Sequence, residues 1–352
     1  MSRRTTVAAM TCLLALTACG GGAGGGAGGA DAKELTVVMW GGDDQKKSVA
    51  AWVEPWARSK GVTVKQDSPT DYAKFRAQVE SKKVSWGAVE VEPNFAVTAC
   101  QNGWAVKLDK TKVDTSAVKA ELVGDCAAPV LEYAFTIAYN TKAFTAANHP
   151  KTWAEFFDTT RFPGKRGFWK YATGAIFEAA LLADGVQKDK LYPLDIDRAF
   201  RKLDTIKKDI VFYETGEQQQ QLVSSGETPL IQAWNGRIFA AAKDGQPVAN
   251  EWNEHFLSYD QVVIPAGYPR ADLAMQWLNH FLADTKGQAQ YANQAAYAPV
   301  NDKALPLVNP EVRKELPTDP ANAAKRAAII DYTYWAANYD KVTERFNEWM
   351  AG

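Results

Sequence analysis

Residues 35–40 read LTVVMW and are followed by the turn GGDD (41–44), a segment with helical periodicity (46–60) and the stretch VTVKQ (62–66). A short continuous apolar run is typical of a strand that is buried on both faces. The succession therefore predicts a strand, a helix and a second strand, which together form a βαβ unit. Such units favour parallel strands whose connecting helices cover the sheet.

Two similar units occur further along the chain. The strand KRGFW (165–169) is followed by the turn KYATG (170–174) and the apolar helix AIFEAALLADG (175–185). The strand TPLIQAW (228–234) is followed by an Asn-Gly turn and the helix RIFAAAKDG (237–245). This alternation predicts an α/β protein with mostly parallel sheets flanked by helices.

Three of these strands end in tryptophan, at Trp40, Trp169 and Trp234, and a glycine-containing turn into a helix follows each one. In open parallel sheets the carboxyl ends of the strands and the helix N-termini behind them line the ligand crevice. The pattern predicts a ligand site with flat apolar walls. The alternative is that the three rings are core aromatics at the sheet edge.

Composition excludes several classes of function. The 352 residues carry a formal net charge of −1 and 46% hydrophobic residues, so the chain can bury two cores and offers no basic stretch for a nucleic acid. The histidines at 149, 255 and 280 lack metal-ligand spacing, and no cofactor or metal is expected.

Enzymatic motifs are also missing from the sequence, which shows no phosphate loop, nucleophile elbow or dinucleotide fingerprint. Glu90 and Glu92 in AVEVEPNF share one face of an expected strand. They fit either paired-carboxylate hydrolysis or an acidic strand end that faces a ligand. We expect a binding protein rather than an enzyme, with a surface-anchored hydrolase as the weaker alternative.

The N-terminus predicts export. Arg3 and Arg4 precede an apolar stretch (7–18) of signal-peptide length, and Leu16 to Cys19 resemble a bacterial lipobox. We expect a signal peptide over 1–18, a lipid on Cys19 and a glycine-rich tether over 19–33. The protein would then lie on the outer face of the bacterial cytoplasmic membrane. The alternative is an ordinary secretion signal with an incidental cysteine.

Cysteine usage fits an exported protein. Cys12 would leave with the signal peptide and Cys19 would carry the lipid, which leaves Cys100 and Cys126 in an oxidising compartment. We expect these two to form a disulfide. Two free buried thiols are the alternative.

Several longer segments resemble the extracellular solute-binding proteins of ABC importers, in their spermidine/putrescine branch. The resemblance covers about residues 35–350. The segments are NTKAF (140–144), HPKTWAEFFD (149–158), RFPGKRGFW (161–169), EAALLADGV (178–186), DRAFRKLDTIKKDIVFYETGEQQQQL (197–222), AWNGRIF (233–239) and ERFNEWM (344–350).

The resemblance implies a two-lobed periplasmic-binding-protein fold that encloses a ligand between lobes and closes by a hinge motion. It places the first lobe at 34–137 and 263–308 and the second at 138–262 and 309–352, joined near Ala138 and Val263. It also implies a monomer whose partners are a small-molecule ligand and a membrane permease.

Polyamine binders of this family use aromatic walls for methylene groups and carboxylates for ammonium groups. The positions that match are Trp40, Trp234, Asp260 and Tyr297. The turn 170–174 departs from the pattern because it contains a lysine and no carboxylate. The candidates to supply the missing charge are Glu90, Glu92 and Glu132, whereas Lys170 and Arg237 would suit a carboxylate or phosphonate.

We therefore expect a small organic cation, a polyamine or related amine, as the ligand. The alternative is an amino acid or another small zwitterion or anion. The expected ligand-binding residues are Trp40, Glu92, Trp169, Tyr171, Trp234, Arg237, Tyr259, Asp260 and Tyr297.

Overall fold

A computed structural model describes residues 33–352 of the chain. The predicted signal peptide, the lipidation at Cys19 and nearly all of the glycine-rich tether lie outside the described residues. Within residues 33–352, no helix has both the length and the apolar character needed to cross a membrane.

The described residues form one nine-stranded sheet in the order β2-β1-β3-β8-β4-β7-β5-β6, with β9 paired to β8. The strands are β1 (Glu34–Val38), β2 (Thr63–Asp67), β3 (Ala88–Val91), β4 (Ala127–Asn140), β5 (Arg166–Trp169), β6 (Ile210–Tyr213), β7 (Leu230–Trp234), β8 (Val248–Val263) and β9 (Ala328–Ile329).

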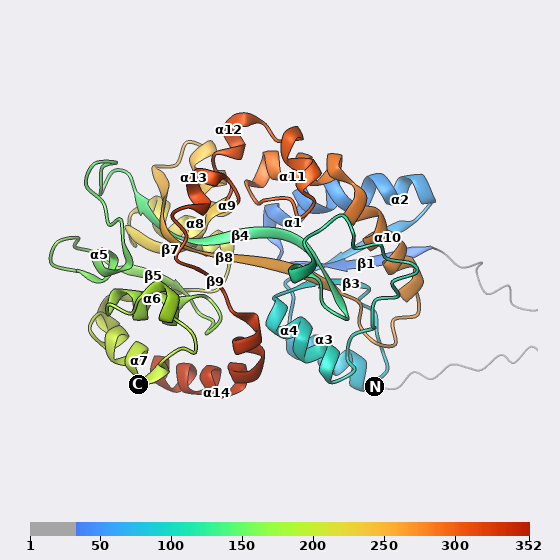
Figure 1. Cartoon of the computed structure of the whole chain (residues 1–352), viewed down its shortest axis with the longest axis horizontal. Helices are drawn as coiled ribbons and strands as arrows, with labels where there is room; N and C mark the ends of the chain where they lie inside the picture. The colour runs from blue at the N-terminus through green and yellow to red at the C-terminus, as the bar shows by residue number, and fades with distance from the viewer. Residues whose placement is uncertain (1–32) are drawn as a thin grey trace, which may run out of the picture. The chain divides into compact units, whose positions relative to one another are not determined.

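The sheet consists of two parallel groups joined by two long strands. β1 pairs in parallel with β2 and β3, and β5 pairs in parallel with β6 and β7. β4 and β8 are antiparallel to each other and run side by side from one group to the other (Figure 1). They contain Ala138 and Val263, the positions at which the sequence predicted connecting strands.

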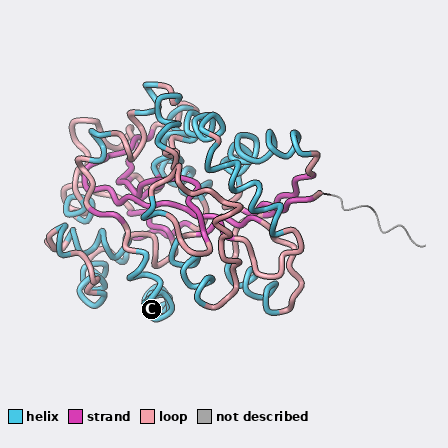
Figure 2. Tube along the Cα trace, turned by 45° about the vertical axis from the view of Figure 1, so that its right-hand side comes forward, coloured by secondary structure: helices cyan, strands magenta, loops and turns pink. Residues whose placement is uncertain are grey.

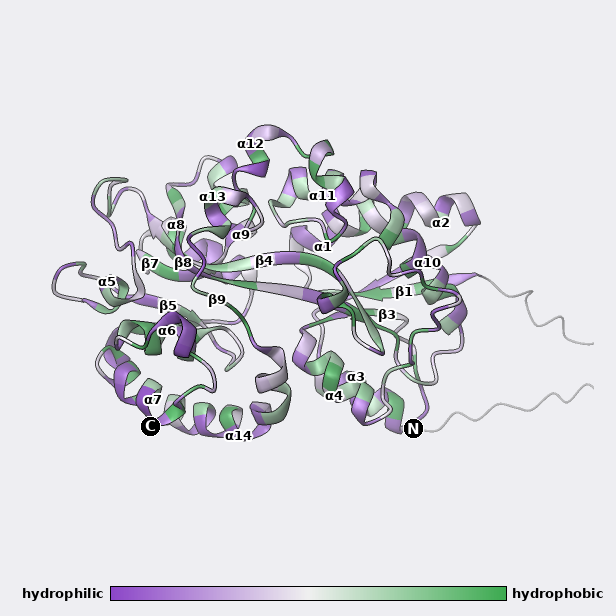
Figure 3. Cartoon of the chain, viewed as in Figure 1, coloured by the Kyte–Doolittle hydropathy of each residue, from purple (hydrophilic) through white to green (hydrophobic). Residues whose placement is uncertain are grey.

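Helices enclose the strands, as Figure 2 shows. They are α1 (Gly42–Ser48), α2 (Glu54–Lys60), α3 (Tyr72–Glu80), α4 (Pro93–Gln101), α5 (Trp153–Phe157), α6 (Ile176–Ala183), α7 (Ile196–Asp204), α8 (Gly216–Ser225), α9 (Asn235–Lys243), α10 (Ala271–Ala283), α11 (Thr285–Ala295), α12 (Pro310–Arg313), α13 (Pro320–Ala323) and α14 (Tyr332–Ala351). A π-helical segment, Val49–Val53, connects α1 to α2. The surface helices α7 and α14 alternate between hydrophobic and hydrophilic residues, as expected for helices with one face on a core (Figure 3).

The predicted units are present, with shifted ends. β1 stops at Val38, so Trp40 lies in the turn beyond the strand. α1 begins at Gly42, within the turn expected over 41–44. α9 begins at Asn235, so Asn235 and Gly236, which were expected to form a turn, already belong to this helix. The expected fold class, an α/β protein with helices flanking the sheet, is confirmed.

Packing around the first helix illustrates how the core forms. Trp52 in the π-helical segment is buried and packs edge-on against Phe281 of α10 and Tyr291 of α11, with ring centroids 5.0 and 4.3 Å apart. Trp277 Nε1 donates a hydrogen bond to the Trp52 carbonyl oxygen at 3.1 Å. Burial of these aromatic rings fixes the first βαβ unit against α10 and α11.

The predicted disulfide is confirmed. Cys100 at the end of α4 is bonded to Cys126, just before β4, across 26 residues of sequence. The bond links α4 to the start of β4, a strand in which every residue is buried.

Candidate ligand-binding site

A cavity of about 440 Å³, including its opening to solvent, lies where the strand ends meet. Its lining residues come from both parallel groups and from the two long strands. They are Trp40, Asp44, Glu90, Glu92, Leu131, Tyr133, Trp169, Trp234, Arg237, Asp260 and Tyr297.

Aromatic rings form much of the wall. Trp169 and Trp234, at the ends of β5 and β7, meet edge to face with ring centroids 5.1 Å apart. Tyr133 and Tyr297 meet at 6.1 Å. These rings offer apolar surface to an alkyl chain and negative π faces to a cation.

Asp260 on β8 contributes a buried carboxyl group. Its Oδ2 accepts a hydrogen bond from Trp40 Nε1 at 2.8 Å, whereas its Oδ1 has no partner. Burial raises the pKa of Asp260 to about 7. Glu90 faces Asp260 from β3, and burial together with the Asp260 charge raises the pKa of Glu90 well above its ordinary value. Burial and mutual repulsion therefore disfavour ionisation of both groups at once.

Glu92, the residue that precedes α4, contributes a second buried carboxyl group. Its Oε2 accepts hydrogen bonds from Thr173 Oγ1 at 3.1 Å and from the Tyr72 hydroxyl at 3.4 Å, while its Oε1 has no partner. Burial, with a smaller contribution from Asp260, raises the pKa of Glu92 to about 8. A positively charged group placed beside Glu92 would favour its ionised form and so oppose this shift.

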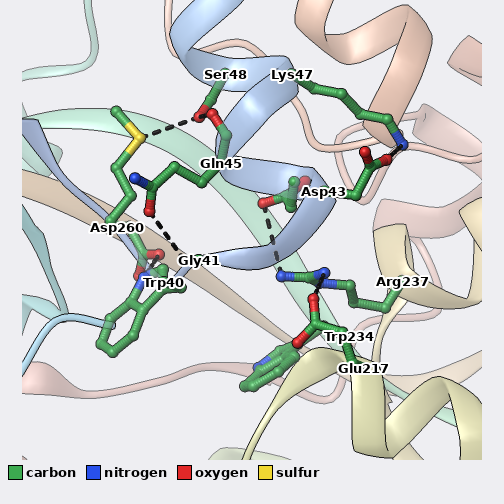
Figure 4. A network of polar contacts seen from close by, with 12 residues as sticks. Trp40, Gly41, Asp43, Gln45, Lys47, Ser48, Glu217, Trp234, Arg237 and Asp260 are labelled. Carbon is green, nitrogen blue, oxygen red and sulfur yellow. Dashed lines mark hydrogen bonds and ion pairs between the residues drawn. The ribbon is translucent and has the colours of Figure 1, made fainter. Parts of the chain in front are cut away.

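Arg237 is the basic residue among the lining residues, and it lies in the first turn of α9. Its Nη1 donates a hydrogen bond to Glu217 Oε1 at 3.0 Å, and its Nη2 lies 4.0 Å from Asp44 Oδ2. Figure 4 shows the guanidinium beside Glu217 and Trp234, with Trp40 and Asp260 across the site. The N-terminus of α9 adds partial positive charge at the same place.

The arrangement provides two kinds of electrostatic contact in one cavity. Asp260 and Glu92 have carboxyl oxygens without partners, which suit an ammonium group. Arg237 has further N–H donors beyond the one used by Glu217, and these suit a carboxylate. No group of three or more His, Cys, Asp or Glu within residues 33–352 is placed to hold a metal ion.

The structure brings most of the expected site residues together. Tyr171 is 44% exposed and lines an adjoining cavity, which shares Trp40, Glu92, Trp169, Trp234 and Arg237 with the first. The residues that line the main cavity as expected are Trp40, Glu92, Trp169, Trp234, Arg237, Asp260 and Tyr297.

The structure places three of the candidate residues away from the main cavity. Tyr259 lies in a separate groove beside Cys100 and Cys126, because adjacent residues of β8 point to opposite faces and Asp260 takes the cavity side. Lys170 pairs with Glu214 on the surface, with 47% of its side chain exposed. Glu132 accepts a hydrogen bond from Lys119 at 2.7 Å and does not line the cavity.

Sequence reasoning missed several lining residues. Asp44 follows the first predicted strand, so the rule that strand ends line the crevice would have found it. Tyr133 and Leu131 lie within β4, where every residue is buried and no alternation shows which side chains face the cavity. The pairing of Glu217 with Arg237 joins two helices and leaves no local signal.

Comparison with known proteins places the chain among bacterial receptors. The sequence matches the family described as bacterial extracellular solute-binding proteins over residues 51–324. The gamma-aminobutyric acid-binding protein of Pseudomonas aeruginosa is 33% identical over 324 residues, which cover 90% of this chain and 91% of that protein. Spermidine/putrescine-binding periplasmic protein 1 of Haemophilus influenzae is 25% identical over 287 residues, which cover 77% of this chain and 74% of that protein.

The fold agrees with these matches. The solved structure of a GABA receptor is 40% identical to this chain and aligns with a TM-score of 0.83 over 90% of this chain and 97% of that one. The resemblance to the wider family of solute-binding proteins is thus confirmed, whereas the match to a polyamine binder is the more distant of the two curated matches. The chain belongs to the bacterial extracellular solute-binding protein family, the substrate-binding receptors of ABC transporters.

Proposed function

We propose that the protein binds a small zwitterionic amino acid whose ammonium and carboxylate groups are separated by an alkyl chain, with GABA as the first candidate. The observation that carries the proposal is that Arg237 lines the same cavity as Asp260 and Glu92, and that each of these two carboxyl groups has an oxygen without a hydrogen-bond partner. The aromatic rings that line the same cavity suit the methylene chain of such a ligand.

This proposal reverses the order of the sequence-based hypotheses, in which a polyamine came first. A polyamine carries only positive charge, and Arg237 would repel an ammonium group placed beside it. The names of the more similar relatives support the amino acid, because the two proteins at 33% and 40% identity are both described by GABA. The carboxylates that suggested a cation are equally suited to the ammonium end of a zwitterion.

The receptor role also supports the remaining sequence predictions. The two parallel groups would be the lobes, with boundaries at 34–137 and 263–308 for the first and at 138–262 and 309–352 for the second. β4 and β8 would be the hinge strands between them, and closure on the ligand would be read by the permease. Membership in a solute-binding family favours stoichiometric binding over turnover.

Lipid anchoring through Cys19 would keep the receptor close to the permease. Metabolic labelling with a fatty acid is expected to mark the full-length protein and not the Cys19→Ala variant. Labelling of the variant would contradict lipid attachment at this residue.

A calorimetric screen tests the ligand class. Purified protein is titrated with GABA, with α-amino acids, with putrescine and spermidine, and with a simple carboxylic acid. We expect saturable binding of GABA or a close ω-amino acid. Tight binding of a polyamine together with indifference to every amino acid would reject the proposal.

Two substitutions separate the ends of the ligand. Asp260→Asn is expected to weaken binding of both GABA and putrescine, because each presents an ammonium group. Arg237→Gln is expected to weaken GABA by about 1.5–3 kcal/mol, the usual range for a hydrogen bond to a charged group, and to spare or strengthen putrescine. Equal losses of both ligands in Arg237→Gln would place the ligand carboxylate elsewhere.

A further inference from the structure

Glu217, in the first turn of α8, does not line the main cavity but contacts the arginine that does. Its Oε1 accepts a hydrogen bond from Arg237 Nη1 at 3.0 Å (Figure 4). The Glu217 side chain is 53% exposed, whereas that of Arg237 is 8% exposed. Glu217 thus stands at the solvent side of a nearly buried guanidinium.

Two glycines make room for this pair. A Cβ atom on Gly42 would lie 1.8 Å from Glu217 Oε1, and Gly42 has a φ of +70° that disfavours other residues. A Cβ atom on Gly216 would lie 2.5 Å from Arg237 Nε and 2.6 Å from its Cζ. Neither position accepts a side chain unless Glu217 or Arg237 moves, so the backbone of α1 and α8 is fitted around these two side chains.

The contact leaves donors of Arg237 for a ligand. A guanidinium has five N–H donors in a planar fork, and Glu217 accepts from one of them. Asp44 lies 4.0 Å from Nη2, too far for a hydrogen bond, and contributes charge. A guanidinium that Glu217 holds through one N–H can bind a carboxylate through two of its remaining N–H donors.

We propose that Glu217 is a positioning residue: it holds the guanidinium of Arg237 in the orientation that receives a ligand carboxylate, and it thereby sets the preference for amino acids over amines. The inference rests on the proposed function. It assigns specificity to a residue outside the cavity. The absence of side chains at Gly42 and Gly216 leaves the space that Glu217 and Arg237 occupy.

The test compares two ligands that differ only at the carboxylate. GABA and its amide, 4-aminobutanamide, are titrated into the unsubstituted protein and into Glu217→Gln, which keeps the shape of the side chain and removes its charge. The ratio of GABA affinity to amide affinity is expected to fall about tenfold in the variant, as expected when a charge-assisted hydrogen bond is misaligned. Glu311→Gln, at an exposed site paired with Lys314, is the matched control and should keep the ratio.

A second pair of variants reaches the same guanidinium from the backbone. Gly216→Ala is expected to lower the ratio as well, because the added Cβ displaces Arg237. Gly124→Ala is the control, since the nearest atom to a Cβ there lies 3.8 Å away. If Gly216→Ala fails to fold, the Glu217→Gln titration still decides the question.

Each outcome has a distinct meaning. Equal losses of GABA and amide binding in Glu217→Gln would show that Glu217 only stabilises the closed protein, and tighter GABA binding would show that it competes with the ligand; either result overturns the inference alone. Failure of every amino acid to bind the unsubstituted protein would overturn the proposed function and this inference together.

Discussion

Ligand binding is expected to release a proton from Glu92. Burial raises the pKa of this carboxyl to about 8, so at pH 7 the free protein holds it mostly protonated. The ammonium group of a bound amino acid, placed beside the unpartnered Oε1, favours the ionised form and lowers this pKa. Binding of the ligand is therefore coupled to the release of a proton from Glu92.

The sign and size of the effect follow from linkage. Because the complex holds fewer protons than the free protein, affinity rises with pH up to the pKa of the free protein. With a pKa of about 8 in the free protein and an ionised carboxylate in the complex, Glu92 alone would increase affinity about 50-fold, or about 2.3 kcal/mol, between pH 6 and pH 8. At pH 7 Glu92 would release about 0.9 proton per ligand, and Asp260, with a pKa of about 7, up to about 0.5 more.

Isothermal titration calorimetry measures the exchange directly. Titrations at pH 7 in buffers with different ionisation enthalpies give a line whose slope is the number of protons released. The Glu92→Gln variant should lose the Glu92 contribution and keep that of Asp260. A slope of zero in the unsubstituted protein, together with an affinity that does not change from pH 6 to pH 8, would refute the reasoning.

Three further outcomes are expected. Replacing Cys100 and Cys126 by serine should destabilise the protein by about 3–4 kcal/mol, because the unfolded chain regains the freedom of the open loop; an unchanged melting temperature would contradict this. Tyr259→Phe should leave ligand affinity unchanged in calorimetry, since the residue lies in a separate groove; a clear loss of affinity would return it to the binding site. Burial raises the pKa of Glu178 to about 7, so the folded protein holds an extra proton there, and stability falls as pH rises from about 4.5 to 7; Glu178→Gln should flatten this part of a melting-temperature profile, and an unaltered profile would argue against it.

The sequence predicted the parts of the fold that depend on local patterns. The apolar run before Trp40 and the helical stretch after it gave a βαβ unit, and the repetition of tryptophan at strand ends pointed to the edge of the sheet where the structure has a cavity. The sequence did not reveal that β3 and β8 pair in antiparallel fashion, because such a pairing depends on contacts between distant segments. The strands within each group are parallel, but the complete sheet contains both parallel and antiparallel pairs.

The candidate site was predictable only in part, for physical reasons. Asp260 and Tyr259 are adjacent on β8, so their side chains point to opposite faces of the sheet and only one of them can face the cavity. The Glu217 side chain has room only because Gly42 lacks a side chain. Gly42 is far away in the sequence, and no spacing rule connects the two residues. The sequence put a cation first because four acidic residues outnumber Arg237 in the cavity, whereas burial raises the pKa of Glu90 and Glu92 and so disfavours their charged forms.

The tryptophans at the strand ends give the receptor an optical property. Trp40, Trp169 and Trp234 are three of its 12 tryptophans, and all line the main cavity. Indole emission responds to nearby charge and to water, so a ligand that displaces water from these rings should shift the intrinsic fluorescence. Ligand binding could then be followed by fluorescence without an added label, and a Trp234→Phe variant would test whether Trp234 carries the signal.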